Sequence, residues 1–439
     1  MKNFNTLNPT DIFSLPNNWN KFKFYNLSSV IKEISKKIEN EDVLSLTQNG
    51  IVVKNVESNK GQIAGSYEKY TKVTPNDIVF NPMDLISGWV DIVTQSGVVS
   101  PSYLSFRLDE NKANPLFILF QFQTLYVNRM LFNFGKGVAT HDGFGRWTIN
   151  EDTILKTNIY LPDLETQNRA IKYLQQKTKN IDTLVKKIQE KIELLKEQQT
   201  TLVNQFVTKG LDSSVEMKDS GVEWIGEIPK HWKLKKLKYI SKVSLSSVDR
   251  HEYDDELKVN ICHYTDVYKN EYISNETQLQ KGTCSESEFQ KFSLVDKDIL
   301  LTKDSESPDD IGIPTFVKGT FENTVCGYHI AIVRIFSDQI YSEYIYRLIQ
   351  SKSSKDYFFT HSSGITRFGL GKGSIENLVI PIPPLNEQIE IAKYIELISS
   401  KSTSISKKLL KKISLLKDYR QSLISSVVTG KVKITKDMA

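Results

Sequence analysis

Apolar residues recur at alternating steps of four and three along two long stretches of the chain, each free of proline and glycine for more than 40 residues. This heptad spacing is typical of a long helix that packs along another helix. Both stretches begin at proline, which is tolerated at a helix start because the first N–H groups have no intrahelical partner. The predicted seam consists of Ile181, Val185, Ile188, Ile192, Leu195, Leu202 and Phe206 in the first stretch and of Leu409, Ile413, Leu416, Leu423 and Val427 in the second.

The second stretch repeats the first one 221 residues later. "IYLPDLETQNRAIKYL" begins at Ile159 and "IPIPPLNEQIEIAKYI" begins at Ile380, and from Leu164 and Leu385 the register holds without a gap for 45 positions, with 14 identities. Each helix would measure roughly 60 Å at 1.5 Å per residue, which favours a role in holding other parts of the chain apart. Any amphipathic helix shows such a pattern, but two gapless copies favour mutual packing. The pattern leaves parallel and antiparallel pairing open, and a pseudo-two-fold antiparallel pair is the simplest arrangement.

A mixed α and β segment precedes each helix. "LPNNWNKFKFYNL" from Leu15 and "IPKHWKLKKLKYI" from Ile228 are related, and short β-branched runs such as "YLSFRL" and "YHIAIVRIF" alternate with the helical stretches "PLFILFQFQTLYVNRMLF" and "YSEYIYRLIQSKSSKDYFF". The predicted class is α+β, with two globular mixed α/β domains separated by two long helices that form a spacer. We place the first domain at 1–162, the first spacer helix at 163–210, a linker at 211–225, the second domain at 226–383, the second spacer helix at 384–432 and a tail at 433–439.

Composition narrows the class of protein. The 439 residues are 39% hydrophobic and 25% charged, and no run approaches the roughly 18 apolar residues that a membrane helix needs. The first residues, "MKNFNTLNPTDIF", do not resemble a secretion signal, so we expect a cytoplasmic protein. The three cysteines Cys262, Cys284 and Cys326 lack C-x-x-C spacing, which argues against a disulfide framework or a zinc site. A net charge of +5 permits a polyanionic partner without requiring one.

Candidate catalytic motifs are incomplete. "NPMD" at Asn81 lacks the second proline and the aromatic of a base-methyltransferase motif and is predicted to be a turn, and "GLGKGS" at Gly369 lacks the Ser or Thr that follows lysine in a phosphate loop. The histidines, including His263 and His329, show no metal-ligand spacing and are interpreted as structural. "DSESPDD" at Asp304 is interpreted as a solvated loop. We therefore predict no catalytic residue and no metal site in this chain.

Three motifs carry a resemblance to a known family. "GVEWIGEIPKHW" from Gly221, "IPIPPLNEQIEIAKYI" and "LISSVVTGKV" from Leu423 resemble the specificity subunit (HsdS) of type I restriction-modification enzymes, over nearly the whole chain. The first copy departs from the pattern, because "PDLETQ" lacks the second proline and the glutamate of "PPLNEQ". The resemblance implies two target-recognition domains that each read half of a bipartite double-stranded DNA sequence, and an antiparallel coiled-coil spacer. It also implies docking of two methyltransferase (HsdM) subunits and of restriction (HsdR) subunits.

The same resemblance implies that this chain carries no cofactor and that S-adenosylmethionine and ATP with Mg belong to the partner subunits. Two alternatives from other classes stay open: a coiled-coil adaptor without DNA contact, and a stand-alone DNA-modifying enzyme.

Two loops in the 221-residue register are the first candidates for DNA contact. "HDGFGRW" at His141 aligns Arg146 with Arg367 of "HSSGITRF". Glycine allows close backbone approach, and arginine can bind phosphate or guanine. Because an arginine shared by domains that read different sequences cannot specify a base, we favour phosphate contact, with structural stacking and base readout as alternatives. Candidate residues are His141, Gly143, Arg146, His361, Gly364, Arg367 and Lys372, with Lys60, Tyr67, Lys69, Tyr264 and Lys269 on polar loops better placed to read bases.

Overall fold

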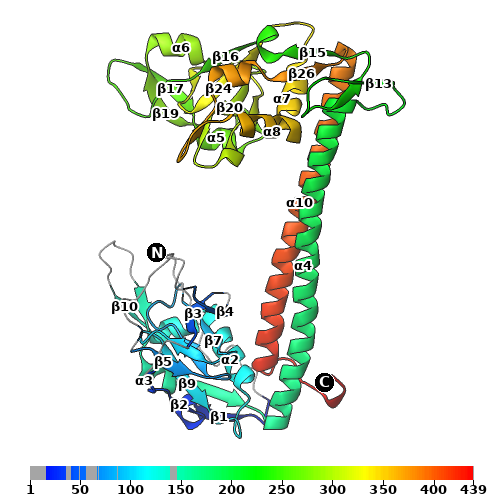
Figure 1. The fold of residues 1–439 in the computed structure, drawn as a ribbon. Helices are drawn as coiled ribbons and strands as arrows, with labels where there is room; N and C mark the ends of the chain where they lie inside the picture. Colours follow the sequence, from blue (N-terminus) through cyan, green and yellow to red (C-terminus); the bar gives the residue numbers. More distant parts are fainter. Residues whose placement is uncertain are drawn as a thin grey trace. The chain divides into compact units, whose positions relative to one another are not determined.

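The computed structural model describes residues 16–35, 41–48, 50–55, 67, 69–86, 88–138 and 146–438. The chain forms two compact units (Figure 1). Unit 1 is Met1–Ile188 with Lys411–Ala439, and unit 2 is Gln189–Leu410. Each unit therefore combines a globular part with segments of both long helices.

The two long helices are α4 (Leu164–Lys209) and α10 (Leu385–Val428). With 46 and 44 residues they would measure about 69 and 66 Å. The α4 helix begins at a side-chain cap, because Asp163 Oδ1 accepts the Thr166 N–H at 2.8 Å. It ends at Gly210, whose φ of +77° is the left-handed conformation that terminates many helices.

The long helices run antiparallel. Within unit 2, Gln199 Nε2 donates to Ser399 Oγ at 3.1 Å, and further along α4 the Phe206 ring lies 5.2 Å from that of Tyr394. Within unit 1, Arg420 Nε lies 3.0 Å from Asp182 Oδ1. Residue numbers thus fall along α10 as they rise along α4, and the predicted antiparallel pair is confirmed.

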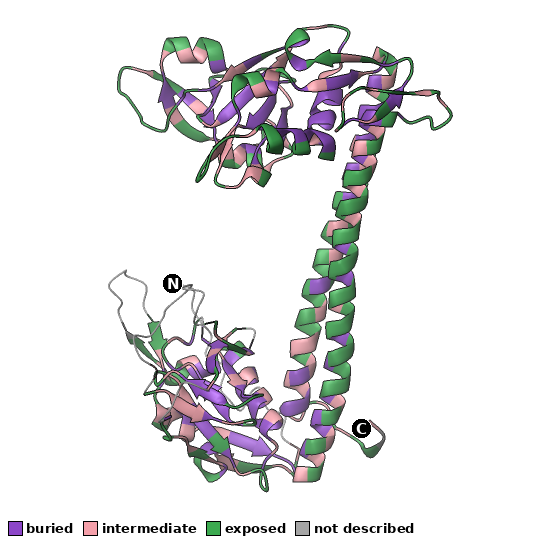
Figure 2. Cartoon of the chain, viewed as in Figure 1, coloured by how far each residue is buried: buried purple, intermediate pink, exposed green. Residues whose placement is uncertain are grey.

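The predicted seam faces the interior of the helix pair (Figure 2). Leu194, outside the seam, is 64% exposed. The described seam positions that are buried are Ile181, Ile188, Ile192, Ile413 and Val427, and those that are half-buried are Val185, Leu195, Leu202, Phe206, Leu409, Leu416 and Leu423.

Unit 1 contains two four-stranded sheets. The first has the order β2-β9-β6-β7 and the second β4-β3-β8-β5, in which β3 and β8 are parallel. Phe117 and Phe122 of helix α2 pack in the main core. The bounds are β1 (Asn20–Lys23), β2 (Ser28–Val30), β3 (Val43–Thr47), β4 (Gly50–Val53), β5 (Thr71–Val73), β6 (Ile78–Phe80), β7 (Val90–Ile92), β8 (Gly97–Val99), β9 (Leu104–Leu108), α2 (Pro115–Val127), β10 (Lys136–Val138), β11 (Arg146–Thr148), α3 (Glu151–Leu155) and β12 (Asn158–Leu161).

Unit 2 follows a related plan, with one more strand in its larger sheet and one fewer in its smaller sheet. Its larger sheet has the order β16-β24-β20-β22-β18, and its smaller sheet β19-β17-β23 again contains one parallel pair, β17 with β23. The bounds are β13 (Met217–Asp219), β14 (Glu227–Pro229), β15 (Lys233–Lys236), β16 (Ser241–Leu245), β17 (Leu257–Cys262), α5 (Tyr264–Lys269), β18 (Tyr272–Ile273), β19 (Gln280–Cys284), α6 (Glu286–Phe292), β20 (Ile299–Thr302), β21 (Asp304–Ser305), β22 (Pro314–Val317), β23 (Thr324–Cys326), β24 (Ile330–Ile335), α7 (Ser342–Gln350), α8 (Lys352–His361), β25 (Phe368–Gly369), α9 (Lys372–Glu376) and β26 (Val379–Ile382). The predicted helical stretch at 341–359 is broken at Ser351, whose hydroxyl caps α8.

The junction that leads into each long helix, called here the joint, is built in the same way in both copies. A two-stranded antiparallel ribbon leads into each helix, β1 with β12 before α4 and β15 with β26 before α10. Two glutamines in the 221-residue register, Gln167 and Gln388, are buried beside these ribbons. Each donates to the carbonyl of a proline before its helix at 2.9 Å and accepts, also at 2.9 Å, the N–H of the residue that caps the domain helix, α2 or α7. The repeated glutamine therefore ties the long helix to its globular part.

Each unit also buries the last turns of the long helix that begins in the other unit. Ile424, Val427 and Val428 of α10 belong to the core of unit 1. Val203 and Val207 of α4 belong to the core of unit 2. Unit 1 is therefore built from two stretches of the sequence, whereas unit 2 is one continuous stretch.

The joint differs between the copies where "PDLETQ" departs from "PPLNEQ". In the second copy Glu387 accepts the indole N–H of the fully buried Trp232 at 3.1 Å and pairs with His231 Nε2 at 2.9 Å. In the first copy the same position is Thr166, which bonds the capping Asp163 at 2.8 Å instead. At this position, the first copy therefore has a side chain that bonds the residue capping the long helix, whereas the second copy has one that bonds Trp232 in the globular part.

Candidate nucleic-acid interface

The loop after α8 in unit 2 is a tight turn that presents two side chains to solvent. Ser363 and Gly369 bond each other through both N–H and C=O groups, at 2.9 and 3.1 Å, and so close the loop. Gly364 has φ +147°, and a Cβ atom there would lie 1.9 Å from the Arg367 carbonyl oxygen. The position therefore requires glycine. At the tip, the Ile365 side chain is 94% exposed, and Arg367 is exposed beside it.

Arg367 bonds to His329, and His329 bonds in turn to Asp304. Asp304 Oδ2 lies 2.8 Å from His329 Nδ1, and Arg367 Nη2 lies 2.9 Å from His329 Nε2 and 3.3 Å from Nδ1. Because an ionised carboxylate only accepts, Nδ1 carries the proton and Nε2 is free to accept from the guanidinium. Asp304 belongs to strand β21, which pairs with β25 directly after Arg367. The strand pairing thus brings Asp304 near Arg367, and the side-chain bonds connect both residues through His329.

Burial is the main reason that the pKa of His329 is lowered, which favours the neutral imidazole. Burial lowers its pKa, and the adjacent Arg367 guanidinium lowers it further against the opposing effect of Asp304. Burial raises the pKa of Asp304, but the hydrogen bonds from Lys303 and His329 outweigh it and lower the pKa overall. His329 also has φ +72°, an uncommon conformation for a residue other than glycine. The arrangement is therefore an ionised carboxylate, a neutral imidazole and a guanidinium in series.

These residues line an open cleft with a volume of about 770 Å³, called here the Arg367 cleft. It is lined by Asp249, Arg250, His263, Tyr264, Asp304, Ser305, Glu306, Ser307, Asp310, Tyr328, His329 and Arg367. The four lining carboxylates outnumber the two lining guanidiniums, and Lys303, which pairs with Asp304 at 2.7 Å, brings the cations to three. The cleft is therefore mixed in charge and not strongly basic.

The register-matched residue in unit 1 lies in different surroundings. Arg146 is exposed on β11, which pairs with β10 in a two-stranded sheet where the cross-strand neighbour of Arg146 is Val138. Lys136, on β10, is also exposed. Within the described ranges, no side-chain hydrogen bond or ion pair is formed by Arg146. His141 and Gly143 lie outside the described residues.

The other predicted residues are dispersed. Tyr264 lines the Arg367 cleft and stacks on Tyr268 at 6.0 Å. The polar loop predicted at His263 is in fact the short helix α5, because Asp266 caps its start by accepting the His263 N–H. Lys269 is exposed in the last turn of α5.

His361 and Lys372 do not line the cleft. His361 bonds the Tyr357 carbonyl at 2.9 Å and stacks on the Tyr357 ring at 4.0 Å, which is a structural role. Lys372 is exposed in α9 and pairs with Glu376 at 3.5 Å.

Among the predicted base-reading residues of unit 1, Lys60 lies outside the described residues and Lys69 is exposed. Tyr67 packs edge-on against Tyr70 at 5.0 Å, and its hydroxyl oxygen is buried. Tyr67 thus takes part in packing, and its role in reading bases stays a prediction.

Asp304 and His329 were not among the residues predicted from the sequence to lie at a DNA-binding site. The prediction of a solvated loop for "DSESPDD" is wrong at Asp304, which is half-buried in a strand and bonded to Lys303 and His329. His329 precedes the apolar strand β24 and lies 38 positions from Arg367, so no short motif joins them. A histidine and an aspartate at strand ends were the available signal, because loops at such ends carry many binding residues.

The remaining candidate chemistry is structural. "NPMD" forms turns in which Asn81 and Asp84 accept backbone N–H groups two residues on. Over the ranges that the structure describes, no group of His, Cys, Asp or Glu could hold a metal ion. The three cysteines are buried and unpaired with one another, and burial raises the pKa of each thiol, which disfavours the reactive thiolate.

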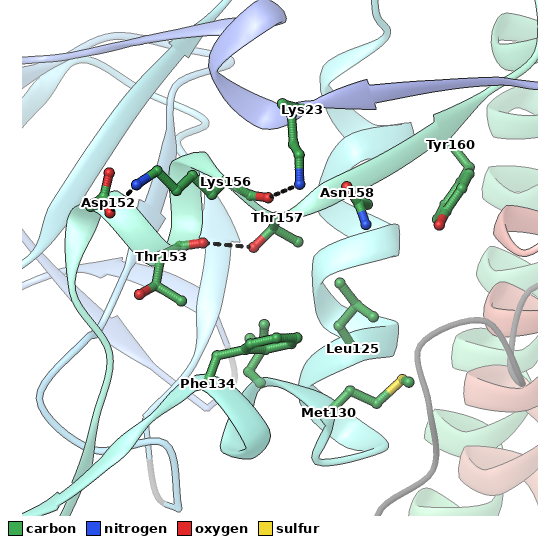
Figure 3. A pocket seen from close by; sticks show the side chains of 11 residues that line it. Lys23, Leu125, Met130, Phe134, Asp152, Thr153, Lys156, Thr157, Asn158 and Tyr160 are labelled. Atoms are coloured by element: carbon green, nitrogen blue, oxygen red, sulfur yellow. Dashed lines mark hydrogen bonds and ion pairs between the residues drawn. The ribbon is translucent and has the colours of Figure 1, made fainter.

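A second cavity, of about 290 Å³, lies in unit 1 (Figure 3). Leu125, Met130 and Phe134 line one part of it. The polar groups opposite bond one another: Lys23 Nζ donates to the Lys156 carbonyl at 2.9 Å, and Lys156 pairs with Asp152 at 2.7 Å. No nucleophile and base meet among its lining residues, so its geometry indicates packing rather than catalysis.

Comparison with known proteins gives consistent matches. The sequence model of the family described as "Type I restriction modification DNA specificity domain" matches residues 229–415. The putative type I restriction enzyme MjaX specificity subunit of Methanocaldococcus jannaschii is 23% identical over 340 residues, 75% of this chain and 71% of that one. The MjaVIII specificity subunit of the same organism is 22% identical over 380 residues, 84% of each chain.

Solved structures share the fold. A chain from a study titled as the structural basis of complex assembly and conformational transition of the type I R-M system gives a TM-score of 0.70 at 14% identity, covering 96% of this chain and all of that one. The HsdS subunit of Thermoanaerobacter tengcongensis gives a TM-score of 0.52 at 14% identity, covering 96% and 99%. Residues 229–415 thus match the type I restriction-modification DNA specificity domain, and over most of its length the chain is similar in sequence and fold to specificity subunits of type I restriction-modification systems.

Proposed function

We propose that this chain is the sequence-specific double-stranded DNA-binding subunit of a type I restriction-modification complex. The globular part of each unit reads one half of a bipartite target. The observation that carries the proposal is the duplicated unit: a pair of sheets of which the smaller contains one parallel strand pair, an antiparallel entry ribbon and a buried glutamine beside it recur in both halves of the chain. A duplicated reader suits a target with two halves.

The paired long helices set the distance between the two half-sites of the DNA target. Duplex DNA displays its base code in the major groove, and successive groove faces recur about every 34 Å. Two uninterrupted helices of 46 and 44 residues, paired along an apolar seam, resist bending and fix a constant gap. The same helices are the proposed docking surface for two methyltransferase subunits, which restriction subunits join to complete the complex.

Catalysis is assigned to those partner subunits. Methyl transfer to a base requires a pocket for the flipped base and a cofactor site. The methyltransferase-like motif at Asn81 and the phosphate-loop-like motif at Gly369 are both incomplete, and no group of His, Cys, Asp or Glu among the described residues could hold a metal ion. From the family resemblance we propose that S-adenosylmethionine and ATP with Mg bind the partner subunits. No helix within the described ranges is long and apolar enough to cross a membrane.

A salt titration tests DNA binding. The full chain with its methyltransferase subunits should retain duplex DNA in a gel-shift assay, and retention should fall steeply with salt because neutralised phosphates release counterions. Absence of retention at low salt would favour the adaptor alternative. Methylation or cleavage by the purified chain alone would favour the stand-alone enzyme.

An insertion tests whether the long helices set the distance between the half-sites. Four residues added after Ile192 and again after Ile413, which occupy the same register position, lengthen both helices by about 6 Å. Mapping of methylated sites should then show a longer gap between two unchanged half-sites. A change in the half-sites at a constant gap would contradict the spacer assignment.

A further inference from the structure

The two arginines that share a register position differ in what holds them. Arg146 lies on an exposed pair of strands with Lys136, with no side-chain partner in the described ranges. Arg367 is bonded to His329, which Asp304 bonds in turn. A residue kept for one shared task would be expected in one shared environment, so the two positions are suited to different tasks.

The charge of the Arg367 cleft disfavours a phosphate. A phosphate that approached Arg367 would also approach the carboxylates of Asp304, Glu306 and Asp310 in the same cleft. Base edges carry no net charge and present both donors and acceptors, so a cleft of mixed charge accommodates them without this repulsion. Sites that hold phosphate rely instead on an excess of cations or backbone N–H groups.

The bond to His329 leaves Arg367 equipped for two-point recognition. A guanidinium has five N–H donors in a rigid planar fork. One bond from Nη2 to His329 occupies a single donor, so one edge with two parallel donors stays free whichever hydrogen is used. Guanine presents two acceptors, O6 and N7, on its major-groove edge at the spacing that such a fork matches.

We infer that Arg367 reads a guanine in the half-site bound by unit 2, and that His329 and Asp304 are the residues that position it. This inference rests on the proposed function and assigns one base contact within it. Arg146 in unit 1 keeps the phosphate role. Aspartate fixes the imidazole tautomer, the imidazole orients the guanidinium, and the guanidinium meets the base.

Charge-preserving substitutions separate the two roles. The full chain, assembled with its methyltransferase subunits, is used to select duplexes from a library randomised across both half-sites, and the retained sequences are counted. Lysine keeps the charge of arginine but lacks the fork. Arg367→Lys should therefore lower the preference for guanine at one position of one half-site by roughly 5- to 150-fold, with other positions and the salt dependence unchanged.

The matched variant in unit 1 should behave in the opposite way. Arg146→Lys should leave every base preference and the affinity unchanged, while Arg146→Ala should weaken binding to all sequences alike and reduce the slope of log affinity against log salt by about 1. His329→Gln should reduce the guanine preference at the Arg367 position without changing that slope, which a merely structural residue would not do. Thermal unfolding of each variant identifies any loss of folding.

Three outcomes would overturn the inference. Full guanine preference in Arg367→Lys would show that the fork is not used. A uniform loss of affinity with a smaller salt slope in Arg367→Ala would show a phosphate contact instead. A selected half-site without guanine would exclude the assigned base, whereas failure of the unmodified complex to select any sequence would refute the proposed function itself.

Discussion

Gln121 and Tyr344 make equivalent hydrogen bonds in the two units, although the side chains are chemically different. Gln121 Nε2 donates to the carbonyls of Tyr160 in β12 and Val428 in the last turn of α10. The Tyr344 hydroxyl, which has one hydrogen to share, lies 3.0 Å from the carbonyl oxygen of Pro381 in β26 and 3.2 Å from that of Val207 in the last turns of α4. Tyr160 and Val207 precede Pro381 and Val428 by 221 residues. Each unit thus uses one buried side chain to join the strand that enters one long helix to the end of the other.

Removing the bonds of Gln121 or Tyr344, called here the clamps, should increase local opening of the helix ends. The last carbonyls of a helix have no intrahelical partner, so a lost bond leaves a buried acceptor unsatisfied, at a cost of about 1–3 kcal/mol. Hydrogen exchange should therefore speed up at 203–210 in Tyr344→Phe and at 424–430 in Gln121→Leu. Tyr419→Phe, at a residue 59% exposed, is the matched control and should change neither segment. Equal exchange in the variants and the control would contradict the clamp.

The two copies of the joint should differ in their sensitivity to mutation. Glu387→Ala leaves the buried Trp232 indole N–H without its acceptor and should lower the free energy of unfolding by about 1–3 kcal/mol. Thr166→Ala, at the same register position, removes bonds near the surface and should cost less than about 1 kcal/mol. Chemical denaturation compares the two, and a larger effect at Thr166 would contradict the structural difference.

Gly364, in the loop after α8, should matter for DNA binding rather than for stability. Gly364→Ala places a methyl group against the Arg367 carbonyl and should displace Arg367, which we expect to weaken binding of the selected duplex about tenfold. Gly371→Ala is the control, because nothing lies within 4 Å of its added Cβ atom. Thermal unfolding and gel-shift titration separate the two effects. Equal binding by both variants would show that the loop shape is not needed.

Acid should destabilise unit 2 through the cleft histidines. Burial lowers the pKa of both His263 and His329, with Arg250 adding to the effect at His263 and Arg367 at His329, against the opposing carboxylates of Asp266 and Asp304. The unfolded chain, with histidine pKa near about 6.5, then binds these protons more readily than the folded chain. The free energy of unfolding should therefore be highest above about pH 6.5 and should fall as the pH drops below it. Denaturation at several pH values should show a weaker fall in His329→Gln, and an unchanged fall would contradict this origin.

The sequence was sufficient where local periodicity determines the structure. A strict heptad spacing can be satisfied only by a long helix with one buried stripe, so the pair could be predicted from residues such as Ile188 and Ile413. The duplication then predicted that both globular parts would share one plan. Their entry ribbons, parallel pairs and buried glutamines follow that plan.

The contacts of the candidate site could not be predicted in this way. Asp304, His329 and Arg367 come from three strand ends that the sheet brings together, and their separations in sequence hold no information about that meeting. The register match with Arg146 even favoured a shared phosphate role, because sequence shows the residue without its neighbours. Likewise, glutamine and tyrosine at the two clamps share no pattern that sequence comparison would detect.

The exchange of helix ends between the units has a consequence for synthesis on the ribosome. The core of unit 1 includes Ile424, Val427 and Val428, which are made only after the whole of unit 2. The core of unit 2 needs Val203 and Val207, which emerge before the globular part that they complete. The domain that is translated first is therefore the last to close, and a chain that stops before Ile424 presents an unfinished N-terminal domain to the quality-control machinery of the cell.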